Sequence, residues 1–318
     1  MIRDLVSTVI PVYNRATMLR EAVASVLAQT WRPIKILIVD DGSTDDTPAV
    51  AAELAATHPE TVRVLRQNNA GPGVARQLGL TASQGEFVQF LDSDDLLLPP
   101  KFALQVAGLR GDAEAGIAYG KSYAEQSGQR QALPAQRTGE CFRQLFPALL
   151  QGPLWPTMTP LYRREVLDAV GPWPRKRQLE DWEYDAQAAA SGIKLHYIDA
   201  FIAETRDHGQ SRLCHLWRHD VSAMRERIAA YRSVLHHAKR AGVGRETPEM
   251  QQFVRSLFWM ARNAGSYGLP VEARQMFELA RSEALHPGWD YRLFGLAGAI
   301  LGWQRASRWA DGLLRRSR

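Results

Sequence analysis

The sequence predicts an α/β protein with a mostly parallel sheet flanked by helices, followed by an all-helical C-terminal extension. Three observations support this fold class. Short apolar runs rich in β-branched residues alternate with segments of helical length through the first hundred residues, and only helical periodicity is present from residue 216 onward. The composition, 45% hydrophobic and 23% charged, is typical of a globular chain. A chain of 318 residues is expected to form two units, at 1–215 and 216–318.

The apolar runs and helical spacings predict the strands and helices of the first hundred residues in order. Thr47 and Pro48 predict a helix N-terminus, because proline is favoured at the first helical position. Strands that are apolar on both faces and alternate with helices indicate a parallel sheet with right-handed crossovers. The predicted strands are 6–12, 34–39, 62–65 and 87–91, and the predicted helices are 19–27, 47–57 and a segment from about 72 to near 85.

The pattern is looser beyond residue 115. We expect strands at 116–119, 157–162 and 194–198, and helices at 141–150 and 180–190. The helical region from 216 is broken at 242–247, 268–270 and 286–288. Residues 261–287 resemble one tetratricopeptide-like hairpin, but no second copy follows, so no repeat array is predicted.

Cysteine content and charge set limits on the type of protein. The only cysteines, Cys141 and Cys214, make no disulfide framework, so a reducing, cytoplasmic location is expected. The longest apolar run has ten residues, about half of the ~20 that a membrane span needs, and no signal peptide is expected. Residues 1–215 carry 22 basic and 25 acidic residues, whereas residues 216–318 carry 17 and 9. The basic tail therefore either meets an anionic partner or is a solvated helical face.

Carboxylates follow the fourth predicted strand directly, in the order Asp92-Ser93-Asp94-Asp95. Ligands of open α/β sheets bind beyond the carboxyl ends of the strands, where Asn14, Asp40 and Asp41 are also expected. Carboxylates held this close repel one another unless a cation lies among them. The cluster predicts a Mg²⁺ or Mn²⁺ site, and the alternative is a solvated turn before a helix.

Three further segments have candidate chemistry. Gly71-Pro72-Gly73 resembles the start of a dinucleotide-binding fingerprint, but Arg76 occupies the position of its third glycine. A dinucleotide-binding site is therefore disfavoured. The same helix start can present donors to a nucleotide, with Arg76 turned towards a base or phosphate. Asp181 begins a predicted helix, where the helix dipole alone favours acidic residues. His208 follows a strand and is the histidine best placed for a site, although a lone loop histidine is usually polar surface.

Together these residues resemble the family 2 glycosyltransferases, which are inverting enzymes with the GT-A fold. The resemblance covers about residues 5–215 and rests on six segments in the order of the family. These are Val9-Ile10-Pro11-Val12-Tyr13-Asn14, Ile38-Val39-Asp40-Asp41-Gly42-Ser43-Thr44-Asp45, Gly73-Val74-Ala75-Arg76, Phe90-Leu91-Asp92-Ser93-Asp94-Asp95, Glu180-Asp181-Trp182 and Arg206-Asp207-His208. Gln77 departs from the asparagine that is frequent in the family, and residues 120–175 match only loosely, so the acceptor is left open.

The resemblance implies a role for each matching position. Asp181 would be the catalytic base. Asp94 would hold the metal, Mn²⁺ or Mg²⁺, with Asp92, Asp95 and His208 as further metal contacts. The implied donor-binding residues are Pro11, Tyr13, Asn14, Asp41, Gly73, Arg76, Asp92 and Asp94, with Asp41 at the nucleobase and Asp92 at the ribose.

The implied reaction is transfer of a sugar from a nucleotide-diphosphate donor, with UDP favoured, to a glycan or lipid-linked hydroxyl in cell-surface polysaccharide synthesis. No nucleic-acid partner is expected. A sugar-nucleotide pyrophosphorylase is one alternative, but residues 13–17 lack the glycine-rich loop that it would need. A non-catalytic sugar-nucleotide-binding module is the other.

Residues 289–318 combine aromatic residues with six arginines. This composition fits either a helix on the inner face of the cell membrane or a helix packed against the preceding helices.

Overall fold

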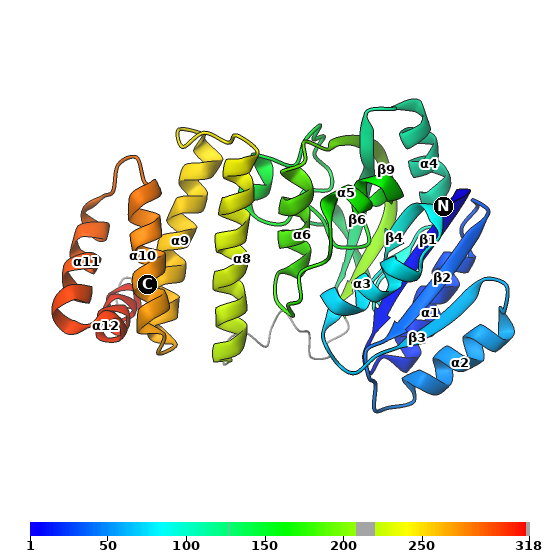
Figure 1. Cartoon of the computed structure of the whole chain (residues 1–318), viewed down its shortest axis with the longest axis horizontal. Coiled ribbons are helices and arrows are strands. Elements are labelled where there is room, and N and C mark those ends of the chain that lie inside the picture. Colours follow the sequence, from blue (N-terminus) through cyan, green and yellow to red (C-terminus); the bar gives the residue numbers. More distant parts are fainter. Residues whose placement is uncertain (127, 208–219, 316–318) are drawn as a thin grey trace. The chain divides into compact units, whose positions relative to one another are not determined.

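The computed structural model describes residues 1–126, 128–207 and 220–315, with the backbone alone for 311–315. The chain divides into two compact units. The first comprises Met1–Leu145 and Pro153–Gln210, and the second comprises Phe146–Gly152 and Ser211–Arg318. Each unit is described separately below (Figure 1).

The first unit is built on one sheet with the strand order β3-β2-β1-β4-β8-β6-β9-β5 and with β7 paired to β6. The first four of these strands are parallel, as are β6 and β9, whereas β8, β5 and β7 pair antiparallel with their neighbours. The predicted mostly parallel sheet is therefore confirmed. The strand bounds are β1 Ile2–Val12, β2 Ile34–Asp40, β3 Val62–Arg66, β4 Gly85–Phe90, β5 Leu96–Leu97, β6 Ala115–Gln126, β7 Gln129–Pro134, β8 Leu161–Arg163 and β9 Lys194–Asp207.

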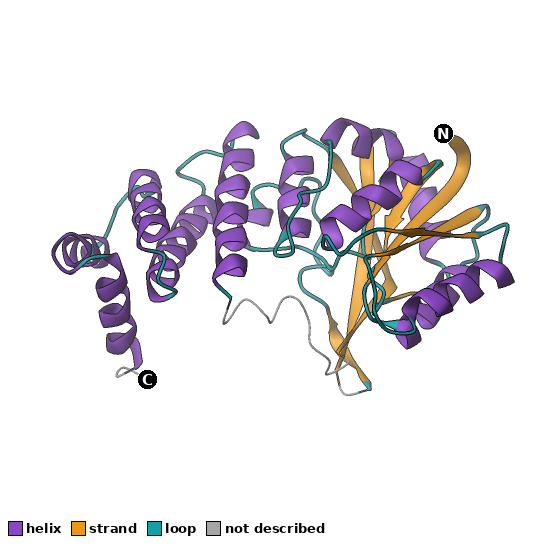
Figure 2. Cartoon of the chain, turned by 60° about the horizontal axis from the view of Figure 1, so that its bottom comes forward, coloured by secondary structure: helices purple, strands orange, loops and turns teal. Residues whose placement is uncertain are grey.

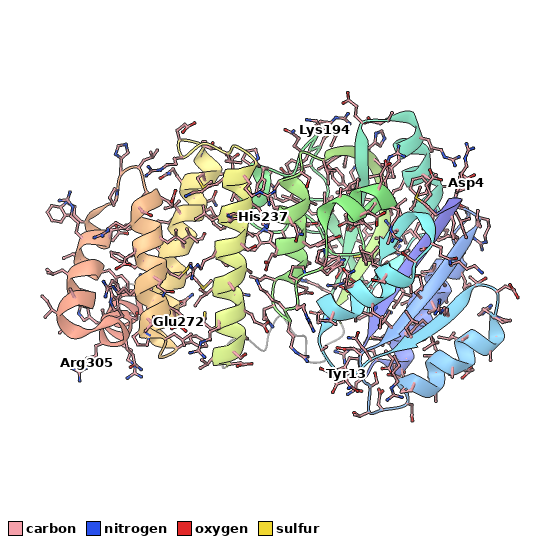
Figure 3. All side chains as sticks on the ribbon, viewed as in Figure 1. Asp4, Tyr13, Lys194, His237, Glu272 and Arg305 are labelled. Carbon is pink, nitrogen blue, oxygen red and sulfur yellow. The ribbon has the colours of Figure 1, made fainter. Side chains whose placement is uncertain are left out.

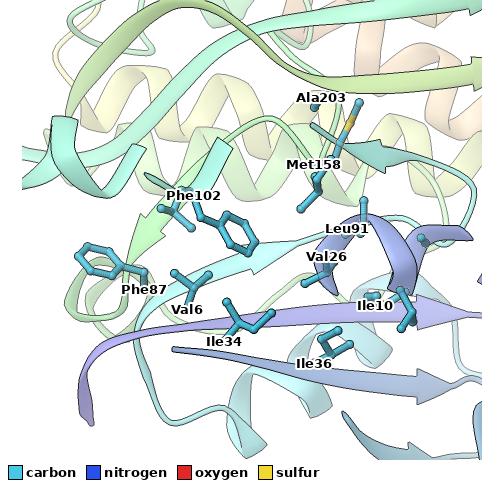
Figure 4. Close-up of a cluster of buried hydrophobic side chains, with 14 of the residues drawn as sticks. Val6, Ile10, Val26, Ile34, Ile36, Phe87, Leu91, Phe102, Met158 and Ala203 are labelled. Atoms are coloured by element: carbon cyan, nitrogen blue, oxygen red, sulfur yellow. The ribbon is translucent and has the colours of Figure 1, made fainter. Parts of the chain in front are cut away.

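Helices cover both faces of this sheet. On one face, α1 (Ala16–Leu27), α2 (Thr47–Thr57) and α4 (Lys101–Gly111) share a buried cluster with alternate residues of β1 and β2, such as Ile10 and Ile36 (Figure 4). On the other face, α3 (Pro72–Ala82) packs so closely that a Cβ on Gly79 would lie 2.3 Å from Val9 Cγ1. Because alternate strand residues point to opposite faces, β1 supplies core to both layers.

Several predictions of the loosely patterned region are wrong or incomplete. No helix spans 141–150, where only the 3₁₀ turn η1 (Ala148–Gln151) forms. Pro147 explains this, because proline donates no backbone hydrogen bond and disfavours helical geometry at the preceding residue. The strand predicted at 157–162 is the short β8, and the strand predicted at 194–198 continues to Asp207. Strand β7 and helix α5 (Arg164–Val170) were not predicted, nor were β5 and α4, which precede this region. Helix α6 (Glu180–Ala189) agrees with the prediction.

The second unit is helical throughout its described residues, as Figure 2 shows. Its helices are α8 (Val221–Arg240), α9 (Pro248–Ser266), α10 (Pro270–Glu283), α11 (Trp289–Leu301) and α12 (Trp303–Arg315). Five aromatic rings meet where α9 to α12 pack, namely Phe258, Phe277, Tyr291, Phe294 and Trp303. The predicted helical extension is confirmed. Within the described ranges, no helix has the length and apolar character needed to cross a bilayer.

Candidate active site

The carboxyl ends of β1 and β2 are joined through Asn14. Its backbone is left-handed, with a φ of 52°, which asparagine tolerates better than most residues. The Asn14 N–H donates to Ser43 Oγ at 3.0 Å, and the Thr44 N–H donates to Asn14 Oδ1 at 2.8 Å. The neighbouring Tyr13 side chain is exposed at this end of β1, while Asp4 marks the opposite end (Figure 3).

The Asp41 carboxylate organises the loop that leads into α3. Oδ1 accepts from Gln67 Nε2 at 2.7 Å and from the Ala70 N–H at 2.8 Å, and Oδ2 accepts from the Gly71 N–H at 2.9 Å. An ionised carboxylate has about four acceptor positions, so these bonds leave one for another donor. Asp41 thus fixes the start of α3 from inside the protein.

A buried arginine connects three segments that are distant in the sequence. Arg76 on α3 donates from Nη1 to Glu180 Oε1 at 2.7 Å and from Nη2 to Asp92 Oδ1 at 2.6 Å. Its guanidinium also lies 4.9 Å from the ring centroid of Trp173. Burial alone would lower the pKa of Arg76, but the charges of Asp92 and Glu180 outweigh it and raise the pKa. Arg76 therefore stays cationic and holds the acidic turn beside the start of α6.

The acidic turn after β4 concentrates negative charge. Burial raises the pKa of Asp95 well above its usual range, and the carboxylates of Asp94 and Asp92 add to that shift. Arg206 on β9 holds this turn, since its N–H donates to Asp95 Oδ1 at 3.2 Å and its Nε donates to the Asp94 carbonyl at 2.7 Å. Arg206 also pairs with Glu21 of α1. The turn is thus fixed by β9 and α1, while its carboxylates remain close together.

The first turn of α6 brings two further carboxyl groups, Glu180 and Asp181, near the acidic turn. Asp181 is half-buried, and its Oδ1 accepts from the Trp182 N–H at 2.8 Å. Burial raises the pKa of Asp181, and Asp92 adds to the shift whereas Arg76 opposes it. Burial also raises the pKa of Glu180 to about 7, although Arg76 acts in the opposite direction. A carboxylate with a raised pKa accepts a proton more readily near neutral pH than an ordinary aspartate does.

The backbone at the start of α6 is strained. Leu179, which precedes the helix, has a φ of 57°. The left-handed conformation costs a residue with a side chain about 1–2 kcal/mol. Such strain is retained where the surroundings require one backbone path, and here that path places both Glu180 and Asp181.

Asp185, one turn further along α6, is a buried carboxyl group that the sequence analysis did not single out. Burial raises its pKa well above the usual range, and the nearby Asp181 adds to the shift. The Tyr162 hydroxyl donates to Asp185 Oδ1 at 3.4 Å. Only the spacing of four residues from Asp181 in a predicted helix could have indicated that the two carboxyl groups share a face.

Replacing Gly73 by alanine is expected to lower the free energy of unfolding by about 1–3 kcal/mol, as overpacking does. A Cβ at this position would lie 2.1 Å from the Pro174 carbonyl oxygen, so one of the two backbones must move. Urea unfolding measures the effect. Gly111→Ala is the matched control, because a Cβ there meets nothing within 4 Å. Equal stability of the two variants would show that the close approach at Gly73 is unimportant.

Residues 7–171 match the sequence profile described as Glycosyl transferase family 2. The chain belongs to this family. An uncharacterized glycosyltransferase of Nostoc sp. (strain PCC 7120) is 30% identical over 304 residues, which cover 94% of this chain and 88% of the relative. The uncharacterized glycosyltransferase YibD of Escherichia coli (strain K12) is 32% identical over 47% of this chain and 42% of its own length.

Solved structures show the same fold. The 1–349 portion of TarS from S. aureus, in complex with UDP-GlcNAc, has a TM-score of 0.64 at 16% identity, with 96% of this chain and 92% of that chain covered. The mannosyltransferase PcManGT from Pyrobaculum calidifontis, in complex with GDP-Man and Mn²⁺, has a TM-score of 0.55 at 18% identity, covering 96% and 83%. These structures confirm the predicted GT-A fold, and the sequence matches above confirm the predicted family 2 membership.

The GT-A fold places the predicted site residues as follows. Asp92 and Asp181 interact electrostatically, and Arg76 bonds Asp92 directly. Pro11 is buried within β1, opposite Val39 of β2. Gly73 lies in the first turn of α3, and His208 lies outside the described residues. Glu180, Trp173 and Arg206 were not predicted as site residues, although Glu180 and Arg206 lie in two of the segments that resemble the family.

The donor set of the acidic turn fits a hard divalent cation. Among the described residues, no group of three or more His, Cys, Asp and Glu side chains is arranged to hold a metal ion. Mg²⁺ sites in phosphate-transferring enzymes often use only one or two carboxylates and complete the shell with water and substrate phosphates. Burial is the main cause of the raised pKa of Asp95, and the neighbouring carboxylates of Asp94 and Asp92 add a repulsion that a cation would relieve. The carboxylates of the acidic turn are therefore ligands of the type that such an ion takes.

Proposed function

We propose that this glycosyltransferase is an inverting, metal-dependent enzyme that moves a sugar from a nucleotide-diphosphate donor to an acceptor hydroxyl. The observation that carries the proposal is the bridge from Arg76 to Asp92 and Glu180. It brings the acidic turn next to Asp181, about ninety residues away in the sequence. In this proposal residues 1–215 bind the donor and catalyse transfer, and residues 216–318 form a separate helical region.

The proposed catalytic base is Asp181. Its raised pKa suits a group that takes the proton of an attacking hydroxyl. Attack on the face of the anomeric carbon opposite the leaving diphosphate inverts the configuration in one displacement. No covalent sugar intermediate is then required, in contrast to a retaining hydrolase with a second carboxylate as nucleophile.

The donor is proposed to bind along the strand ends. Asn14 connects the ends of β1 and β2, and Asp41 fixes the loop between β3 and α3. Pro11 of β1, Tyr13 after it and Gly73 of α3 would contribute to the nucleotide site. Arg76 would orient Asp92 towards the ribose. Asp94 would hold the metal with Asp92, Asp95 and His208 as further contacts, and a bound divalent cation would neutralise charge that develops on the leaving diphosphate.

Asp94→Ala is expected to abolish sugar transfer, and chelation with EDTA should do the same to the wild type. Both remove the counter-charge of the diphosphate. Transfer is measured as nucleotide release from a panel of UDP- and GDP-sugars in the presence of Mn²⁺. Asp46→Ala, an exposed aspartate before α2, serves as the control and should retain activity. Full wild-type activity in EDTA would contradict the metal dependence but not the fold.

The same assay separates the alternatives. A sugar-nucleotide pyrophosphorylase would release a sugar phosphate in the presence of pyrophosphate, and a non-catalytic module would bind the donor without turnover. The UDP-GlcNAc complex of TarS supports UDP as the first nucleotide to test, while the GDP-Man complex of PcManGT makes GDP the second. A glycan or lipid-linked acceptor, used in cell-surface polysaccharide synthesis at the cytoplasmic face of the membrane, is part of the same proposal.

A further inference from the structure

Helix α11 has two apolar faces. One face is buried in the helical unit, where Tyr291 and Phe294 are nearly inaccessible among the rings of Phe258 and Phe277. The opposite face is a line of large apolar side chains in water. We call it the outer stripe, and its members with their exposed fractions are Trp289 75%, Leu293 53%, Leu296 60% and Ile300 71%.

The spacing makes these two faces independent. At about 100° per residue, positions 289, 293, 296 and 300 lie within about 60° of one another, and positions 291, 294 and 298 lie on the other side of the helix. The inner face already supplies the contacts that hold α11 to the unit. The outer stripe therefore makes no contribution to that packing, and a contiguous exposed apolar patch indicates an interaction site.

Exposed arginines lie on α11 and on the helix α12 that follows it. The Arg292 guanidinium lies 5.3 Å from the ring centroid of Trp289. On α12, Arg305 (labelled in Figure 3) and Arg308 are exposed beside the exposed Trp309. The single acidic residue of α11, Asp290, is paired with Arg255 at 2.6 Å. Among the described side chains of 289–310, the surface charge is therefore basic.

We infer that the outer stripe of α11 inserts into the interfacial region of an anionic lipid bilayer, with the arginines at the headgroups. Apolar side chains flanked by tryptophan and arginine match the depth profile of such an interface. Each arginine near an anionic leaflet adds to the attraction. A second copy of the chain fits less well, because a symmetric contact would bring equivalent arginines together.

The inference assigns the predicted membrane association to one defined surface. It depends on the exposure and charge of α11 and α12 and not on the proposed reaction. Because donor turnover can be assayed without vesicles, failure of one proposal is distinguishable from failure of the other.

The test is flotation of the full chain with vesicles of phosphatidylcholine and phosphatidylglycerol at about 3:1, at low and high salt. Wild-type protein is expected to float with these vesicles at low salt and to be released by high salt. Leu293→Ser/Ile300→Ser should lower the partition coefficient about tenfold or more. Arg305→Gln/Arg308→Gln should lower it by a similar factor on anionic vesicles and reduce the salt dependence.

The matched control is Leu133→Ser/Val271→Ser, which removes two exposed apolar side chains elsewhere, with exposed fractions of 79% and 63%. It should bind within about twofold of wild type. Circular dichroism and thermal unfolding establish that each variant is folded. The inference is overturned if wild-type protein does not float with the vesicles at low salt. It is also overturned if the stripe variant and the control variant lose vesicle binding to the same extent. If wild-type protein is a dimer that does not bind vesicles, and only the stripe substitutions make it monomeric, the face instead binds a second copy of the chain.

Discussion

Replacing Asp181 by asparagine is expected to lower turnover at least about 100-fold, while the donor Kd stays within a few-fold of the wild-type value. Asparagine keeps the shape of the side chain and an acceptor oxygen for the Trp182 N–H, but it cannot take a proton from the acceptor hydroxyl. Single-turnover kinetics and calorimetric titration with the donor measure the two quantities separately.

The control for this variant is Asp168→Asn, an exposed aspartate of α5 that pairs with Arg164. It should retain wild-type turnover. If Asp181→Asn instead weakens donor binding and keeps turnover, Asp181 is a binding group and another residue must act as the base. The pH profile gives a further check. Because the pKa of Asp181 is raised, wild-type turnover should fall on acidification at a higher pH than an ordinary aspartate would give.

Replacing Arg76 by methionine is expected to cost about 3–5 kcal/mol of folding free energy, because it leaves Glu180 buried without its cationic partner. Asp92, which is half-buried, loses the same partner, so donor affinity should fall as well. Urea unfolding and donor titration measure the two effects.

Two variants make this result specific. Arg76→Met/Glu180→Gln should be less destabilised than Arg76→Met alone, because the buried charge is removed together with its partner. Arg20→Met breaks the exposed pair with Glu53 and should change stability little. If the double variant is no more stable than the single one, lost packing of the Arg76 side chain against Trp173 explains the effect better than charge does.

Local sequence patterns were sufficient to predict those strands and helix starts that depend mainly on their own residues. The runs that predicted β1, β2 and β4 are apolar on both faces, and the polar residues that follow them mark the edge where Asn14, Asp41 and Asp92 lie. The start of α2 at Thr47-Pro48 was likewise predicted from the sequence, because proline in the first turn is a local signal of a helix start.

Contacts between segments that are distant in the sequence could not be predicted. The bonds from Arg76 to Asp92 and to Glu180 span 16 and 104 residues, and no periodicity predicts such pairs. Lys101 illustrates the same limit in the core. It is fully buried, its ammonium donates to the Thr159 carbonyl at 2.8 Å, and burial lowers its pKa well below the usual value. A lysine after two prolines is expected at the surface, and only the tertiary fold gives it an interior position.

The path of the chain between the two compact units constrains how this protein could be cut, fused or recombined. Residues 146–152 leave the first unit and return to it, and within the helical unit the Gln151 side chain donates to Gln252 of α9 at 3.1 Å. Leu149 and Leu150 of this short loop are buried. A fragment that ends near residue 215 would therefore retain Leu149 and Leu150 without the helices of the second unit that pack with them. A chimaera that takes its C-terminal helices from a relative is therefore expected to be more stable when residues 146–152 are taken from the same relative.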